Sequence, residues 1–398
     1  MSAFFESLET RQMMSASLKS GVLRVAGTDG SDNIVVTVEA GRLVVTTNGV
    51  VDGRFARSGV KRMAIDTFDG DDSVNVASAV TAPALIKTGD GDDLVNAGSG
   101  GDTILGGDGD DVIRSRKGDD RIDPGTGFDL LDGGAGLDTI DFSSSSTAME
   151  IGLNGYAKIR TTQLRVTSFH RIENADGSQG DDNITGNAAT TLIRGNGGHD
   201  RLEAFGAPTT LSGGAGDDVL VDAIDWRNLL DGGTGNDTAD YSEHQSNPVT
   251  VSLDNLANDG EAGENDLVRA AENIRGGFRD DTLVGNDAAN VIDGYYGNDT
   301  VSGLGANDKL LGGWGQDNLD GGAGNDTVNG GEDDDMLTGG AGSDALLGDA
   351  GADSLFANDG ERDALDGGAD TDFARVDPPL TGVIDSTTSV ENVRSNAL

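Results

Sequence analysis

Residues 312–347 read GGWGQDNLD, GGAGNDTVN, GGEDDDMLT and GGAGSDALL. These four consecutive nonapeptides follow the pattern G-G-x-G-x-D-x-U-x, where U is a large aliphatic residue, and only Asp333 departs from it. The same register holds without a gap over 276–356, and it also holds over 88–141 and 177–221. A short repeat of fixed period is typical of a stacked solenoid rather than of a globular domain.

The eighth position of the repeat distinguishes an ordered solenoid from a disordered acidic chain. Large aliphatic and Phe residues make up only about a fifth of the chain, close to the compositional boundary of disorder. A disordered tail has no reason to place an aliphatic side chain at every ninth position, yet all twenty units do so. The residues are Val95, Ile104, Ile113, Ile122, Leu131, Ile140, Ile184, Ile193, Leu202, Leu211, Leu220, Leu283, Ile292, Val301, Leu310, Leu319, Val328, Leu337, Leu346 and Leu355. The repeat blocks are therefore predicted to fold.

A second periodicity, of 99 residues, divides the chain further. The tripeptide DFS at 141–143 recurs as DYS at 240–242, and EN at 173–174 recurs at 272–273, both 99 residues later. A shortened third copy begins with DF at 372–373 and ends with EN at 391–392. The predicted organisation is an N-terminal tag, helical or loose, at 1–20; a β-rich start of the solenoid at 21–87; repeat block 1 at 88–141; a β insert at 142–176; block 2 at 177–240; a second β insert at 241–275; block 3 at 276–375; and a C-terminal cap or secretion tail at 376–398.

The composition excludes several classes of protein. With 27 basic and 70 acidic residues the formal charge is −43, which excludes a nucleic-acid binder. No apolar run approaches the ~20 residues that span a bilayer, and cysteine is absent, so that disulfides and thiolate metal sites are excluded. The first twenty residues lack the basic start and apolar stretch of an ordinary secretory signal.

The repeat itself points to a cation. Each unit divides into a glycine-rich turn and a three-residue strand whose central side chain points inward. Two units form one coil of 18 residues, so that the sixth-position aspartates of alternate units stack above one another, as do Asp93, Asp111 and Asp129. Carboxylates about 5 Å apart repel each other, and the core of one aliphatic per strand is thin. Ca²⁺ takes carboxylate and carbonyl oxygens in flexible geometry, whereas Mg²⁺ demands a tighter octahedron.

These units resemble the repeats-in-toxin (RTX), or hemolysin-type, calcium-binding repeat family over about half of the chain. The resemblance implies an all-β fold, a right-handed parallel β-roll or β-solenoid loaded with calcium, in a bacterial protein secreted by the type I route with an uncleaved C-terminal signal. The inserts are similar to spacers between such blocks, especially VTVSLDNLANDGEAGEND at 249–266. The predicted calcium ligands are Asp93, Asp102, Asp111, Asp120, Asp129, Asp138, Asp182, Asp200, Asp218, Asp281, Asp299, Asp308, Asp317, Asp326, Asp335, Asp344 and Asp353.

Three units depart from Asp at position six, with Thr191, Thr209 and Asn290. The two threonines fall on one edge, so block 2 is predicted to bind calcium along the other edge only. Counting gaps between same-edge aspartates gives about a dozen structural ions. The isolated Asp32 and Asp72 are interpreted as solvated turn carboxylates.

A search for catalytic motifs returns little. The three histidines, His170, His199 and His244, form no H-E-x-x-H arrangement, and no G-x-S-x-G elbow is present. Between 151 and 172 there is no acidic residue, whereas Lys158, Arg160, Arg165, His170 and Arg171 cluster there. This basic strip is interpreted as a solvated or ion-paired face, with contact to an acidic polysaccharide as the alternative. Trp226, Trp314, Tyr295 and Tyr296 are interpreted as exposed turn residues or block caps, with sugar stacking as the alternative.

The leading hypothesis is a secreted, non-enzymatic calcium-binding solenoid, at the cell surface or in the extracellular matrix, with a structural or adhesive function. Calcium would trigger its folding outside the cell. The alternatives are a polysaccharide-acting enzyme, lyase-like or epimerase-like, with Lys158, Arg160 or Arg165 as its base, and a calcium-roll accessory module of a larger assembly. Calcium ions are the expected partners, and an acidic polysaccharide or cell-surface matrix is a further candidate.

Overall fold

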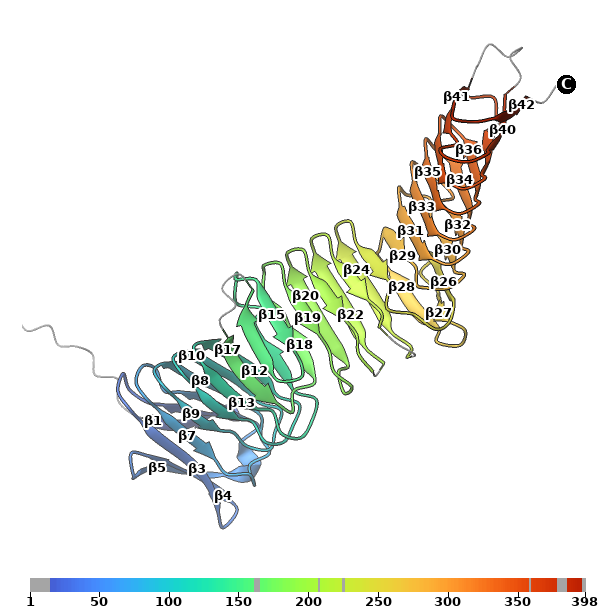
Figure 1. Ribbon diagram of the computed structural model, residues 1–398. Helices are drawn as coiled ribbons and strands as arrows, with labels where there is room; N and C mark the ends of the chain where they lie inside the picture. Colours follow the sequence, from blue (N-terminus) through green and yellow to red (C-terminus); the bar gives the residue numbers. More distant parts are fainter. Residues whose placement is uncertain are drawn as a thin grey trace, which may run out of the picture. The chain divides into compact units, whose positions relative to one another are not determined.

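The computed structural model describes residues 15–160, 165–206, 208–223, 226–357, 359–377 and 385–395. The chain forms two units, Met1–Gln179 and Gly180–Leu398. In each unit the strands are stacked like rungs along two facing sheets (Figure 1). Within the described residues there is one 3₁₀ turn, η1 (Arg57–Gly59), and no helix that is long and apolar enough to cross a membrane.

Both sheets of unit 1 are mainly parallel. The first contains β1 (Ser15–Lys19), β2 (Val22–Ala26), β6 (Arg62–Asp66), β8 (Ala84–Asp90), β10 (Thr103–Asp108), β12 (Arg121–Thr126), β14 (Thr139–Asp141) and β18 (Asn174–Asp176). The second contains β3 (Asn33–Glu39), β4 (Arg42–Thr47), β5 (Val50–Ala56), β7 (Ser73–Val76), β9 (Leu94–Asn96), β11 (Val112–Arg114), β13 (Asp129–Asp132), β15 (Met149–Gly152), β16 (Tyr156–Ile159) and β17 (Arg165–His170).

Unit 2 repeats this arrangement. Its first sheet contains β20 (Leu192–Gly197), β22 (Thr210–Ala215), β24 (Leu229–Thr234), β26 (Val249–Ser252), β27 (Ala257–Glu261), β28 (Asp266–Arg269), β30 (Thr282–Val284), β32 (Thr300–Ser302), β34 (Asn318–Ala323), β36 (Met336–Ala341), β38 (Ser354–Ala357), β40 (Phe373–Val376) and β42 (Asn392–Ser395). Its second contains β19 (Asn183–Thr185), β21 (Arg201–Glu203), β23 (Val219–Val221), β25 (Thr238–Asp240), β29 (Asn273–Arg275), β31 (Val291–Tyr296), β33 (Lys309–Trp314), β35 (Thr327–Glu332), β37 (Ala345–Ala350), β39 (Ala364–Asp366) and β41 (Ser386–Thr388).

The predicted parallel β-solenoid is confirmed. Within the blocks, neighbouring strands pair residues 18 positions apart, for example Ile113 with Leu131 in unit 1 and Leu319 with Leu337 in unit 2. All twenty position-eight aliphatics point inward, and none is more than 1% exposed. The core is thus a single file of aliphatic side chains along each sheet.

The inserts and the chain ends join the same sheets. Each insert contributes three antiparallel strands, β15–β16–β17 in unit 1 and β26–β27–β28 in unit 2. Of the predicted tag at 1–20, Ser15–Lys19 forms strand β1 rather than a helix or a loose segment, whereas residues 1–14 lie outside the described residues. In the predicted tail at 376–398, β41 and β42 extend the sheets, and 378–384 and 396–398 lie outside the described residues.

Because the core is thin, each inward-pointing aliphatic side chain contributes substantially to the free energy of unfolding. We expect Leu319→Ala to lower the free energy of unfolding by about 2–5 kcal/mol, because it leaves a cavity between Val301 and Leu337 that the stacked sheet cannot close. Asn318→Ala, at the exposed neighbouring position, is the matched control and should change it by less than about 0.5 kcal/mol. Urea unfolding in saturating calcium, followed by circular dichroism, measures both. Equal midpoints for the two variants would contradict the assignment of the core.

Candidate calcium-binding ladders

The sixth-position aspartates form continuous ladders along the coil edges. The backbone N–H of Asp299 donates to Oδ1 of Asp317 at 2.7 Å, and the N–H of Asp317 donates to Oδ1 of Asp335 at 2.8 Å. The same step of one coil connects Asp93 to Asp111 at 2.9 Å in unit 1. Each carboxylate is therefore fixed by the coil before it.

The structure gathers all seventeen predicted ligands into five such lines. None of these aspartates is more than 4% exposed. In unit 1 the lines are Asp93, Asp111, Asp129 and Asp102, Asp120, Asp138; in unit 2 they are Asp182, Asp200, Asp218, then Asp308, Asp326, Asp344, and Asp281, Asp299, Asp317, Asp335, Asp353.

The second oxygen of most ladder carboxylates is buried without a hydrogen-bond partner among the described residues. This holds for Oδ2 of twelve of the seventeen predicted ligands, including Asp111, Asp299 and Asp317. An unsatisfied buried carboxylate oxygen is strongly unfavourable. Twelve such atoms, arranged in files along the coil edges, are the feature of this structure that requires a counter-charge.

The glycine at position one keeps a space open beside that oxygen. At Gly312 an added Cβ would meet both Oδ2 of Asp317 and the carbonyl oxygen of Gly330, one coil further on. At position four, Gly315 has φ of +121°, and an added Cβ would collide with the Gly297 carbonyl oxygen. Carboxylate and carbonyl oxygens thus converge on one cradle, which is the all-oxygen donor set that Ca²⁺ prefers. The Asp carboxylates and the position-one carbonyls would hold the ion, and the ion would neutralise the carboxylates.

The buried aspartates are poor anions in the absence of a cation. Burial, together with the neighbouring carboxylates of Asp281 and Asp317, raises the pKa of Asp299 to about 8. Burial likewise raises the pKa of Asp335 and of Asp200 to about 8, with neighbouring aspartates again adding to the rise. Closely spaced like charges that share a buried environment disfavour ionisation in this way.

Five further aspartates belong to the ladders but were missed or misinterpreted from the sequence. Asp32 and Asp72 are each only 3% exposed, so they are not solvated turn carboxylates. The N–H of Asp32 donates to Oδ1 of Asp72 at 2.7 Å, and the N–H of Asp72 donates to Oδ1 of Asp93 at 2.7 Å. Asp237, Asp363 and Asp372 follow their predecessors by 19 residues instead of 18. A search for a strict nine-residue period misses these aspartates because of the one extra residue. The GGTGND turn that ends at Asp237 nevertheless has the sequence of a repeat turn.

The recurring Glu-Asn pairs continue the ladders across the inserts. Oε2 of Glu173 accepts the N–H of Asp138 at 2.9 Å, and Oε2 of Glu272 accepts that of Asp237 at 2.8 Å. Near the C-terminus Glu391 accepts the N–H of Asp372 at 2.9 Å. The sequence shows the recurrence of these Glu-Asn pairs but not the position of the glutamates in the ladder.

The units with Thr or Asn at position six keep the backbone hydrogen bond to the next coil but lack the carboxylate charge. The N–H of Thr209 donates to Oδ1 of Asn228 at 2.8 Å, and the N–H of Asn290 donates to Oδ1 of Asp308 at 2.8 Å. Thr209 and Asn290 are buried, whereas Thr191 is half-buried. The edge of block 2 that carries Thr209 therefore stacks on neutral side chains, and its lack of calcium remains a prediction.

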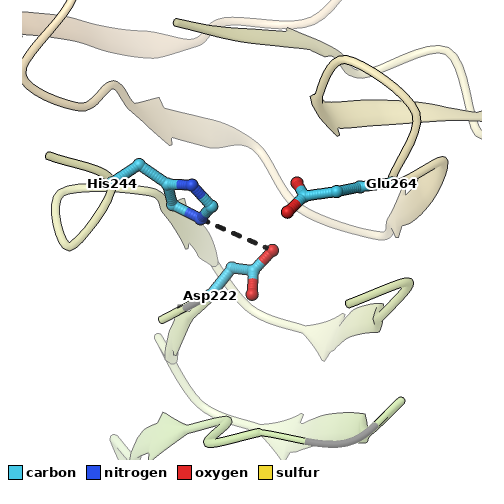
Figure 2. Close-up of side chains that lie close together, drawn as sticks. All are labelled: Asp222, His244 and Glu264. Atoms are coloured by element: carbon cyan, nitrogen blue, oxygen red, sulfur yellow. Dashed lines mark ion pairs between the residues drawn. The ribbon is translucent and has the colours of Figure 1, made fainter. Parts of the chain in front are cut away.

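The three histidines occupy different environments. His170 lies 3.4 Å from Asp132, and the exposed His199 accepts a hydrogen bond from the N–H of Asp217 at 2.8 Å. His244 is buried and points toward the carboxylates of Asp222 and Glu264 (Figure 2). Sequence reasoning did not anticipate the environment of His244.

Lys158 and Arg171 of the basic strip in the first insert are ion-paired. Lys158 lies 2.8 Å from Glu150, and Arg171 pairs with Asp132. The side chain of Arg165 lies outside the described residues. These pairs agree with the interpretation of the strip as an ion-paired face.

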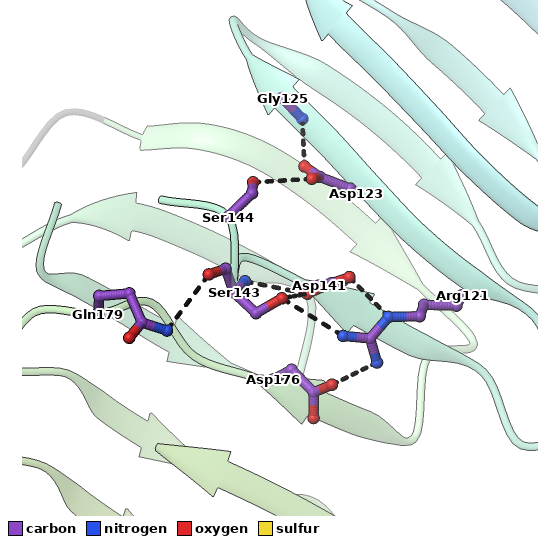
Figure 3. A network of polar contacts seen from close by, with 8 residues as sticks. All are labelled: Arg121, Asp123, Gly125, Asp141, Ser143, Ser144, Asp176 and Gln179. Atoms are coloured by element: carbon purple, nitrogen blue, oxygen red, sulfur yellow. Dashed lines mark hydrogen bonds and ion pairs between the residues drawn. The ribbon is translucent and has the colours of Figure 1, made fainter. Parts of the chain in front are cut away.

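The DFS motif fastens the first insert to the coil below it. Nε of Arg121 lies 2.6 Å from Oδ2 of Asp141, and Arg121 also pairs with Asp176 (Figure 3). Oδ1 of Asp141 accepts the N–H of Ser143 at 2.9 Å, and Gln179 donates to the Ser143 carbonyl at 3.3 Å. The recurrence of the tripeptide thus reflects a structural clamp.

Comparison with known families points to the same repeats. The profile of the RTX calcium-binding nonapeptide repeat (4 copies) matches residues 87–122, 117–144, 176–204, 209–221, 275–310, 311–346 and 338–374, which together make up half of the chain. No curated protein matches the chain significantly.

The raised pKa values set the pH dependence of the metal-free chain. Between the ordinary pKa of Asp, about 3.9, and the folded value of about 8 for Asp299, the folded chain binds more protons than the unfolded chain. Its free energy of unfolding therefore falls as the pH rises through this window. In calcium-stripped buffer we expect the β signal in circular dichroism to increase as the pH is lowered from about 8 to about 5.5.

In excess calcium the direction should reverse, because protons compete with the metal for the same oxygens. A metal-free β signal that is independent of pH, or that grows with rising pH, would contradict the burial of protonated ladder carboxylates.

Proposed function

Because the chain belongs to the RTX calcium-binding nonapeptide repeat family, we propose that this calcium-binding solenoid is a structural or adhesive element outside a bacterial cell, and that calcium folds it there. The observation that carries the proposal is the files of buried carboxylate oxygens without a hydrogen-bond partner. Repeats of this family are typically structural rather than catalytic, in agreement with a non-enzymatic role.

The ladders are the proposed calcium sites. Ions between successive same-edge aspartates give about a dozen sites from the predicted ligands. The pairs Asp32–Asp72, Asp72–Asp93, Asp218–Asp237, Asp344–Asp363, Asp353–Asp372 and Asp363–Asp385 offer further gaps of the same kind. Each ion would neutralise carboxylates that otherwise repel each other.

Such sites make folding conditional on the calcium concentration. At the low calcium level of the cytosol the carboxylates would oppose compaction and keep the chain extended, in a form suited to type I export. Outside the cell, binding free energy would act as folding free energy, because the sites do not exist in the unfolded chain. The thin aliphatic core, one residue per strand, agrees with this dependence.

Calcium titration of the wild-type chain and of Asp317→Asn tests the proposal. We expect a cooperative coil-to-β transition in circular dichroism, reversed by chelator and not reproduced by Mg²⁺. Asp317→Asn keeps an acceptor for the N–H of Asp299 but removes the charge shared by the gaps to Asp299 and Asp335. It should bind about two fewer ions by equilibrium dialysis and require more calcium to fold. Asp320→Asn, at the exposed end of the same repeat, is the control and should behave as wild type.

β-structure that persists in excess chelator would contradict calcium-triggered folding. Equal ion counts for Asp317→Asn and Asp320→Asn would contradict the ladder as the binding site.

A surface on unit 2 supports glycan contact as the adhesive activity. The ring of Tyr296 stacks on Phe278 with centroids 5.0 Å apart, and Trp314 lies 6.2 Å from Tyr296 at an interplanar angle of 24°. Trp314 is 55% exposed, so its face is accessible to a sugar ring. A polysaccharide-acting enzyme is less well supported, because its candidate base Lys158 is paired with Glu150.

We expect Trp314→Ala to weaken calcium-dependent binding to immobilised alginate by about two- to tenfold, because stacked aromatics contribute about 0.5–1.5 kcal/mol each beyond their buried area. Trp226→Ala removes the other tryptophan, which is 49% exposed, and should leave binding unchanged. Affinity electrophoresis measures both variants. An equal effect of the two substitutions, or no retardation of the wild type, would contradict glycan contact at this surface.

A further inference from the structure

A cluster of polar side chains lies where the second insert meets block 2, apart from the ladder files described above. Asp222 follows β23, His244 lies in the turn after β25, and Glu264 lies in the turn between β27 and β28 (Figure 2). Each offers one ligand atom, and these atoms all lie within 4.8 Å of one another. Three separate segments of unit 2 thus converge on one point.

Each of the three residues uses one atom for positioning and leaves another free. Oδ1 of Asp222 accepts a hydrogen bond from Nδ2 of Asn228 at 2.7 Å, and Oε2 of Glu264 accepts the N–H of Glu261 at 2.5 Å. Nδ1 of His244 lies 3.0 Å from Oε1 of Glu261. Among the described residues, Oδ2 of Asp222, Oε1 of Glu264 and Nε2 of His244 are buried without a hydrogen-bond partner.

Two neighbours share this pattern. Oδ1 of Asp266 accepts the N–H of Asn228 at 2.6 Å, while its Oδ2 is buried and unpartnered in the part of the chain that the structure describes. The hydroxyl of Tyr241, a residue with no exposed surface, is likewise unpartnered there. Five unsatisfied polar atoms therefore collect in one buried place.

The protein side chains at this place supply too little positive charge. Asp222, Glu264 and Asp266 are three carboxylates, and His244 is the only basic side chain that pairs with any of them among the described residues. The distance of 3.8 Å from Nε2 of His244 to Oδ2 of Asp222 is too long for a hydrogen bond.

The first insert shows that the fold does not require this cluster. The residues 99 positions earlier are Asp123, Phe142, Ser145, Arg165 and Thr167. They retain one carboxylate, with neither the histidine nor the tyrosine, and Asp123, Phe142 and Ser145 line a pocket of about 550 Å³. The corresponding residues of unit 1 therefore lack this donor set.

We propose that Asp222, His244 and Glu264 bind one divalent transition-metal ion of the Zn²⁺ class, with Asp266 and Tyr241 as further oxygen donors. An imidazole nitrogen together with carboxylate oxygens suits Zn²⁺ and related metals, whereas Ca²⁺ selects oxygen alone. Glu261 orients the imidazole as an outer-shell carboxylate, because a proton on Nδ1 directed at it leaves the Nε2 lone pair for the metal. The ion fastens the β27–β28 hairpin to the preceding coil, and it uses residues distinct from the proposed calcium ladders.

The three histidines of the chain permit a direct test on the full-length wild type. One equivalent of ZnCl₂ is added to ¹⁵N-histidine-labelled protein in saturating calcium, and the imidazole nitrogens are followed by NMR. We expect the Nε2 resonance of one histidine to shift as one equivalent binds, and the other two to remain unchanged. No shift, or parallel shifts of all three, would overturn the proposal.

Variants assign the shifted signal and provide a matched control. His244→Gln should lose the shifted resonance and about 100-fold or more in Zn²⁺ affinity, and Glu264→Gln should also weaken binding. His199→Gln, at an exposed turn, should retain full affinity. Equal affinities for His244→Gln and His199→Gln would overturn the site. The calcium-induced transition is recorded in parallel, so that a failure of the calcium ladders is distinguished from a failure of this site; if His244→Gln does not fold, the wild-type NMR titration still decides.

Discussion

Repulsion between stacked, buried carboxylates is the constraint on which the rest of this structure depends. Each ladder aspartate is held within one coil of the next by a backbone hydrogen bond, as Asp317 is held by Asp299, so the charges cannot move apart while the chain is folded. A core of one aliphatic per strand is too thin to offset files of unsatisfied carboxylate oxygens. The family to which the chain belongs resolves this conflict with calcium.

The glycine-rich turn is shaped by the same repulsion between stacked carboxylates, because it provides the space for a cation between them. At Gly312 position one lacks a side chain, and a Cβ there would fill the space between a carboxylate and a carbonyl oxygen. Position four must adopt a positive φ, as at Gly315, so that successive turns can stack closely. The high glycine content, which makes the composition resemble that of a disordered chain, is therefore required by the turns that form the ion cradle.

The sequence was sufficient for the strands and for most of the ladder, because both follow a strict period. It failed where the period breaks. Asp32 and Asp72 are connected across coils of 40 and 21 residues, so their spacing carries no ninefold signal. Asp363 was missed because one additional residue shifts the register. The surroundings of His244 are formed by three segments that come together only in the folded chain, so the spacing of residues in the sequence does not predict them.

The directed bond from each Asp N–H to the carboxylate of the following coil also limits how such a chain can change its length in evolution. If 18 residues are removed, each Asp N–H still meets an equivalent carboxylate on the next coil, and the stack is only one coil shorter. Removing nine exchanges the two edges, and in block 2 this would place the neutral edge of Thr209 in line with the charged edge of Asp200. Whole coils, rather than single nonapeptides, are therefore the units that duplication or loss can transfer without disturbing either edge.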